Sequence, residues 1–267
     1  MKTLHIENSE YQLPEHLNEM TVPQLVFLSK LVAMKIPIQE IKVKMLFHCL
    51  KAKVKRMKNE QYHRISIENH LFAMTTEQVV VAASAFDYLF TKPDKNGLCF
   101  FDNRLTRNPF PEIKIRGHKF IAPAEALTDI SYNRYIYLET YNSVMQRKPE
   151  AIYVFMGTLF RRPNAPFNPD DLNLEHMNRL KPDVIVLMCW FYIGSIRFIA
   201  DKFPRIFPAD GGNANGGSVF DEQMHLLDFM AKADPTKKKL IREDRLYDVL
   251  YSLDYMLEEL ENRSGLD

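Results

Sequence analysis

Cysteine is scarce in this sequence. Three of the 267 residues are cysteines, Cys49, Cys99 and Cys189, and they lie far apart along the chain. An odd number of distant thiols does not form a disulfide framework, and the Cys-x-x-Cys pair typical of zinc sites is missing. We therefore expect free, buried thiols in a protein of a reducing compartment.

The sequence also lacks an excess of one charge and an apolar run of membrane-spanning length. Its 35 Lys and Arg residues nearly balance 34 Asp and Glu residues, so binding to nucleic acid would need a local patch. Residues 184–200 are the most apolar segment, but they fall short of the roughly 20 apolar residues of a transmembrane helix and include Arg197. The N-terminal MKTLHIENSEYQ lacks the apolar core of a signal peptide. We expect a cytosolic protein without membrane contact, with a buried core helix at 184–200.

Motifs for catalysis, nucleotide binding and metal binding are missing as well. Four of the nine glycines lie in PADGGNANGGS, residues 208–218, which matches neither a P-loop nor Gly-x-Gly-x-x-Gly. There is no Gly-x-Ser-x-Gly and no His-Glu-x-x-His. The nearest group of metal-ligand types is His63, Glu68 and His70 in YHRISIENH, which we interpret as an exposed polar connector. The sequence thus predicts no catalytic residue, no cofactor, no metal and no enzymatic activity.

The sequence does contain a series of helix signals. The frame Met-Thr-x-x-Gln opens MTVPQLVFLSK and later MTTEQVVVAAS. In each copy the Thr and Gln form a capping box, Thr21 with Gln24 and Thr75 with Gln78, and apolar residues follow at helical spacing. Because the similarity does not extend over a whole unit, it indicates two helix starts and not a repeat architecture.

A longer helix is predicted to begin at Pro37 and to run to about Met57. Apolar residues cover most of its circumference and leave one narrow strip of lysines. The strip consists of Lys44, Lys51, Lys55 and Lys58. Its simplest interpretation is a solvated helix face, and the alternative is contact with a phosphate backbone or an acidic partner surface. DNA binding through this face is therefore the alternative function.

A small β-containing insert and further helices follow. EIKIRGHKFIA, with Gly117 between two short apolar runs, predicts a hairpin. Helical spacing resumes near Ser131, at Pro149 and at Pro182. The glycine-rich stretch 208–218 is predicted to be a flexible linker.

The C-terminal part ends in an amphipathic helix with leucines at alternating spacings of four and three. These are Leu246, Leu250, Leu253, Leu257 and Leu260. The pattern is typical of a helix that packs lengthwise on another helix, and two heptads are too few for a free coiled coil. We expect this face to pack within the chain, with dimerisation as the alternative, and we take it, with the lysine strip, as the candidate interaction residues.

Together these patterns predict a mostly α fold, a multi-helix domain with a small β-hairpin insert. The 46% hydrophobic content is sufficient for a real core. The predicted segments are a helical segment 1–90, the β-containing insert 91–127, a central helical core 128–207, the linker 208–218 and C-terminal helices 219–267 packed on the core.

Four stretches carry a resemblance to a known family. They are LPEHLNEMTVPQLVFLSKLV, YIYLETYNSVMQRKPEAIYVFMGTLFRRP, VLMCWFYIGSIRFIADKFPRIFP and LLDFMAKADPTKKKLIREDRLYDVLYSLDYMLEELE. In this order they resemble uncharacterised tail- or virion-associated proteins of phages and prophages in Bacteroidota. The resemblance spans most of the chain and rests on apolar frames with a few anchors, among them Leu-Phe-Arg-Arg-Pro and the helix around Trp190.

The resemblance implies a non-enzymatic role in virion assembly through contacts with other phage structural proteins. Such a protein is either a ring component that joins the head to the tail, and then a homo-oligomer, or a chaperone for a tail protein. It implies a location in the host cytoplasm during assembly and, for a ring component, in the virion. No functional residues are carried over to this chain.

Overall fold

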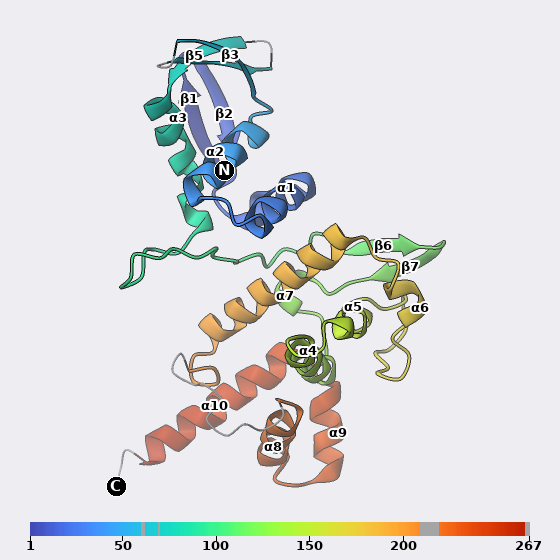
Figure 1. Cartoon of the computed structure of the whole chain (residues 1–267). Helices are drawn as coiled ribbons and strands as arrows, with labels where there is room; N and C mark the ends of the chain where they lie inside the picture. Colours follow the sequence, from blue (N-terminus) through green and yellow to red (C-terminus); the bar gives the residue numbers. More distant parts are fainter. Residues whose placement is uncertain (60–61, 69, 209–218, 265–267) are drawn as a thin grey trace. The chain divides into compact units, whose positions relative to one another are not determined.

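The computed structural model describes residues 1–59, 62–68, 70–208 and 219–264 (Figure 1). The chain divides into two compact units, Met1–Arg104 and Leu105–Asp267. The described residues form ten α-helices and three small antiparallel sheets. The prediction of a mostly α fold with a small β component is confirmed.

The first unit combines strands with short helices. In chain order its elements, with η for a 3-10 helix, are β1 (Lys2–Ile6), β2 (Ser9–Leu13), η1 (Leu17–Glu19), α1 (Val22–Ala33), α2 (Ile38–Cys49), β3 (Lys53–Asn59), β4 (Tyr62–Ile67), β5 (His70–Thr75), α3 (Thr76–Ala83) and η2 (Ser84–Leu89). β1 and β2 form one antiparallel hairpin, and β3, β4 and β5 form a second sheet in that order. Tyr11 of β2 and Phe72 of β5 meet edge to face, with ring centroids 6.3 Å apart, so the hairpin packs against the second sheet.

Both predicted capping boxes begin a helix. Gln24 Oε1 accepts a hydrogen bond from the Thr21 amide at 2.8 Å, and α1 follows directly. At α3 the exchange is reciprocal, because Gln78 Oε1 accepts from the Thr75 amide at 2.8 Å and Thr75 Oγ1 accepts from the Gln78 amide at 3.1 Å. Side chains therefore satisfy amides that the first turn of a helix leaves without partners.

The predicted helix from Pro37 to Met57 is wrong in its second half. α2 ends at Cys49, and Lys51 has a left-handed φ of 50°. The Ala52 amide donates to the Phe47 carbonyl at 2.8 Å, the bond that closes a helix in a Schellman motif. The chain then enters β3, where Val54 pairs with Ile65 of β4. Pairing with the next strand along the chain thus overrides the helical periodicity.

The stretch YHRISIENH is not an exposed connector, as predicted, but two strands. It contributes β4 and the start of β5, with Ile67 paired to His70. Ile65, Ile67 and Phe72 are buried, so these strands bury one face in the unit. The alternation of polar and apolar residues in HRISI is the sequence signal for a half-buried strand.

The second unit is mostly helical. Its elements are β6 (Glu112–Ile115), β7 (His118–Ile121), η3 (Glu125–Leu127), α4 (Tyr132–Met145), η4 (Pro149–Ala151), α5 (Ile152–Leu159), α6 (Leu174–Met177), α7 (Pro182–Lys202), α8 (Val219–Ala231), α9 (Pro235–Glu243) and α10 (Leu246–Ser264). The predicted hairpin is β6 and β7, joined by Arg116 at φ 50° and Gly117 at φ 81°. Two consecutive left-handed residues are the geometry of a tight hairpin turn, and Gly117 adopts it without steric cost. The predicted linker lies outside the described residues from position 209 onward.

A buried arginine joins two helices of the second unit. Arg134 on α4 is almost fully buried, and it donates from Nε to the Thr158 carbonyl at 2.7 Å and from Nη2 to the Leu159 carbonyl at 2.6 Å. α5 ends at Leu159, so the guanidinium satisfies carbonyl groups that the last turn of the helix leaves without partners. These bonds hold α4 against the end of α5.

The C-terminal helices contact α4 and the segment before it. Tyr132 Oη donates to Gln223 Oε1 of α8 at 2.8 Å, and Arg242 of α9 donates to Asn133 Oδ1 at 2.6 Å. Of the leucine face on α10, Leu246, Leu250 and Leu253 are buried, Leu257 is half-buried and Leu260 is 47% exposed. The expected burial of the whole face is therefore wrong at its C-terminal end.

α7 is buried on one side only. Among the described residues it alone is long and apolar enough to cross a membrane by length and composition, which is weak evidence for a span. Leu187, Phe191 and other residues face the interior, whereas Val186, Ile193 and Phe198 are between 39% and 45% exposed. The expected burial of this helix therefore holds for one face of α7 and fails for the face that carries Val186, Ile193 and Phe198.

Leu253→Asp is expected to lower the free energy of unfolding by about 3 kcal/mol or more, because it places an unpaired charge in the core. Urea denaturation of the purified chain measures this. Leu260→Asp is the matched control on the exposed part of the same helix, and its effect should stay below about 1 kcal/mol. Equal effects of the two substitutions would contradict the burial of Leu253.

Glu139→Gln is expected to stabilise the protein at about pH 7. Burial raises the pKa of Glu139 above its ordinary value of 4.5. The hydrogen bond that Glu139 accepts from the Tyr192 hydroxyl lowers this pKa somewhat. An acid with a raised pKa in the folded state costs stability once the pH exceeds the unfolded value, and costs nothing below that value. The gain from Gln, whose oxygen still accepts from Tyr192, should therefore vanish as the pH falls below 4.5. Urea denaturation at several pH values measures it, with the exposed Glu150→Gln as control; a gain that does not depend on pH would contradict this account.

Candidate functional site

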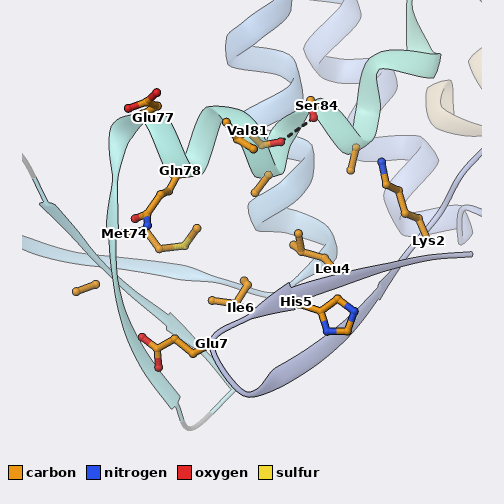
Figure 2. A pocket seen from close by; sticks show the side chains of 13 residues that line it. Lys2, Leu4, His5, Ile6, Glu7, Met74, Glu77, Gln78, Val81 and Ser84 are labelled. Atoms are coloured by element: carbon orange, nitrogen blue, oxygen red, sulfur yellow. Dashed lines mark hydrogen bonds between the residues drawn. The ribbon is translucent and has the colours of Figure 1, made fainter.

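A groove of about 660 Å³ lies in the first unit between β1, the end of β5 and α3 (Figure 2). Residues 2 and 4–7 line one side, and α3 with the start of η2 lines the other. Ala73 and Met74, at the end of β5, complete the lining. The volume is in the range of ordinary ligand pockets.

The local sequence explains why α3 lies beside β1. Thr75 ends β5 and Thr76 begins α3, so no loop separates strand and helix. The Thr75 and Gln78 capping box fixes the direction of the helix as it leaves the sheet. Val79, Ala82 and Ala83 are the buried residues of α3 and attach it to the unit.

β1 borders the groove with an open edge. Ile6 and Ser9 close a two-residue turn, and the ladder pairs Leu4 with Tyr11 and Lys2 with Leu13. In an antiparallel ladder hydrogen-bonded pairs alternate with pairs that are not bonded, so the main-chain groups of Thr3 and His5 point away from β2. In the described part of the chain, the main-chain hydrogen bonds outside this ladder include none from Thr3 or His5. These groups are available to another strand.

The opposite wall of the groove is an apolar helix face. Val81 is 66% exposed, and Ala82 and Ala85 lie buried beneath it. Leu4 and Ile6 project from β1 toward this wall in Figure 2. A strongly exposed valine beside an unpaired strand edge is a surface that gains free energy when another apolar group covers it.

The charges of the groove are separated along its length. Glu7 and Glu77 lie near one end, and Lys2 lies at the other, close to Ser84 (Figure 2). Ser84 Oγ donates to the Val81 carbonyl at 2.7 Å. The groove is therefore acidic at the end of the β1 turn and basic at the start of β1, although the whole chain is nearly neutral.

The residues that line the groove are suited to binding a partner. They provide apolar contacts, free main-chain donors and acceptors, two acidic side chains, Glu7 and Glu77, and one basic side chain, Lys2. Within the described ranges, no group of three or more His, Cys, Asp or Glu side chains could hold a metal ion.

The structure does not form the predicted lysine strip. Lys44 lies on α2, where Glu40 pairs with it at 2.8 Å, whereas Lys51 lies in the turn after α2. Lys55 and Lys58 belong to β3. Residues spaced for one helix face therefore lie on a helix, a turn and a strand, because α2 ends at Cys49.

The cysteines and histidines singled out in the sequence take structural positions. Cys49 and Cys189 are half-buried, and burial raises the pKa of each thiol to about 12, so both are protonated at neutral pH. Cys49 Sγ accepts a hydrogen bond from Gln24 Nε2 at 3.3 Å. His63 on β4 shares a 2.8 Å hydrogen bond with Thr76 Oγ1 at the start of α3.

Sequence reasoning missed the residues that form the groove. The alternation in KTLHI and SEYQL is the signal that could have predicted β1 and β2. The run Val79, Val80 and Val81 is too apolar for a helix with a single buried face, and Val79 alone of the three is buried. Such an excess indicates an exposed apolar surface.

Comparison of the chain with protein-family models, with curated proteins and with solved structures found no match.

Proposed function

We propose that this protein is a non-enzymatic phage virion structural or assembly protein that acts through protein–protein contacts. Two lines of support converge on contact with other proteins. The first is the sequence resemblance to tail- and virion-associated proteins. The second, which carries the proposal, is the groove, where an open strand edge lies beside the exposed Val81.

Both features of the groove favour a protein partner. An unpaired strand edge is a template for pairing with another chain, and natural proteins usually protect such edges. Here the edge is adjacent to apolar surface, and the exposed face of α7 in the second unit adds Val186, Ile193 and Phe198. Surfaces of this kind are typical of proteins that assemble with others.

The proposed role takes one of two forms. A ring component of the head–tail connector stays in the mature particle as a homo-oligomer. A tail assembly chaperone binds a tail protein and leaves. Both act in the host cytoplasm, and both need partner contacts and no chemical step.

Mass spectrometry of purified phage particles tests the role. We expect either stoichiometric amounts of the chain, as for a ring component, or its presence only in assembly intermediates, as for a chaperone. Sequencing of the DNA around the gene is the independent check. Neighbouring metabolic genes, with no portal, capsid or tail gene nearby, would refute the proposal.

The alternative function is DNA binding through a lysine-rich helix face, and it predicts an affinity that depends steeply on salt concentration. Four lysines that each contact a phosphate would give a slope of about −3.6 in the logarithm of affinity against the logarithm of salt concentration. Because Lys44, Lys51 and Lys55 lie on different elements, we expect no such binding at low salt in a fluorescence anisotropy titration with duplex DNA. Tight binding with that slope, lost in Lys44→Gln and Lys55→Gln, would favour the alternative.

A further inference from the structure

We propose that the groove binds an extended segment of a partner protein as an additional strand on β1, antiparallel to it, with a basic residue opposite Glu7 and Glu77 and an acidic residue opposite Lys2. The proposal rests on the proposed function only in that the partner is a protein. It specifies the shape, direction and charge of the segment.

The strand edge determines that the occupant is extended. Thr3 and His5 direct their amide and carbonyl groups away from β2, and His5 is among the residues that line the groove. Only another extended backbone presents donors and acceptors at the matching spacing. A helix in this groove would leave them unpaired.

The helix wall determines which side chains the segment carries. Side chains of an added strand alternate between two faces, and every second one continues the face of Leu4 and Ile6. That face meets α3, where Val81 is 66% exposed. The segment should therefore carry apolar, β-branched residues at alternate positions.

Antiparallel pairing sets the direction, and the charges then set which end of the segment is basic. β1 runs from Lys2 to Ile6, so an antiparallel segment begins near Glu7 and Glu77 and ends near Lys2. A basic residue near its start and an acidic residue near its end then meet opposite charges. Antiparallel pairs are also the commoner kind of strand pairing.

The length of β1 sets the length of the segment. From Lys2 to Glu7 a strand advances about 17 Å at roughly 3.4 Å per residue. A segment of about six residues therefore reaches from one charged end of the groove to the other.

The first test uses the full chain and two blocked synthetic peptides. One is acetyl-Arg-Val-Thr-Val-Thr-Glu-amide, and the other has Arg and Glu exchanged. By fluorescence anisotropy, with a dye attached through a linker, we expect the first peptide to bind about five- to tenfold more tightly, since the exchange removes two ion pairs and creates two repulsions. Equal affinities would overturn the proposed direction, and no binding of either peptide would overturn the proposal.

Variants of the chain then locate the site. Val81→Asp should weaken binding of the matched peptide at least tenfold, whereas Val80→Asp, at a neighbouring exposed position of α3 outside the groove lining, should leave it unchanged. Both valines are exposed, so both variants should fold, which circular dichroism checks. The double variant Glu7→Lys with Glu77→Lys should prefer the exchanged peptide. Failure of this reversal would overturn the charge assignment.

Backbone methylation separates strand addition from simple apolar contact. N-methyl groups on the amides that face β1 should abolish binding, and N-methyl groups on the alternate amides should have little effect. If the peptide that is N-methylated on the amides facing β1 still binds, strand addition is overturned.

Assembly separates this inference from the proposed function. If peptides do not bind but Val81→Asp still blocks particle assembly, the proposed function stands and the occupant has another shape. If peptides bind as expected but the chain has no part in phage particles, the groove assignment stands and the proposed function falls.

Discussion

The direct junction of β5 and α3 is the constraint on which the first unit depends. Thr75 belongs to the strand and caps the helix, and Gln78 returns the hydrogen bond, so the chain changes direction without a loop. A flexible connection would leave the position of α3 undefined. With the capping box in place, α3 lies beside β1, and one wall of the groove is fixed relative to the other.

The two units are held together internally by different physical means. In the first, strand ladders are prominent, and the outer edge of β1 has no strand partner among the described residues. In the second, Arg134 satisfies carbonyl groups at the end of α5, and Leu246, Leu250 and Leu253 of α10 are buried.

The charged residues of the groove are unevenly distributed along it, although the chain as a whole is nearly neutral. The chain has nearly equal numbers of acidic and basic residues, and composition alone therefore names no partner. Glu7 at the turn after β1 and Glu77 in the first turn of α3 lie toward one end of the groove, on opposite sides of it. Lys2 lies at the other end because β1 runs the length of the groove. Separated charges of this kind give orientation and specificity more than affinity.

The sequence by itself determined the local features of this protein: the two capping boxes, the hairpin around Gly117, the start of α7 at Pro182 and the mostly α class. Each follows from side chains within a few residues of one another, where hydrogen bonds and backbone preferences decide. Only the tertiary structure decided that α2 stops at Cys49, since β3 gains its partners from β4, and that Leu253 is buried while Leu260 is exposed. The groove was likewise decided by the tertiary structure. Its walls come from β1 and α3, which are about 70 residues apart and meet only through packing.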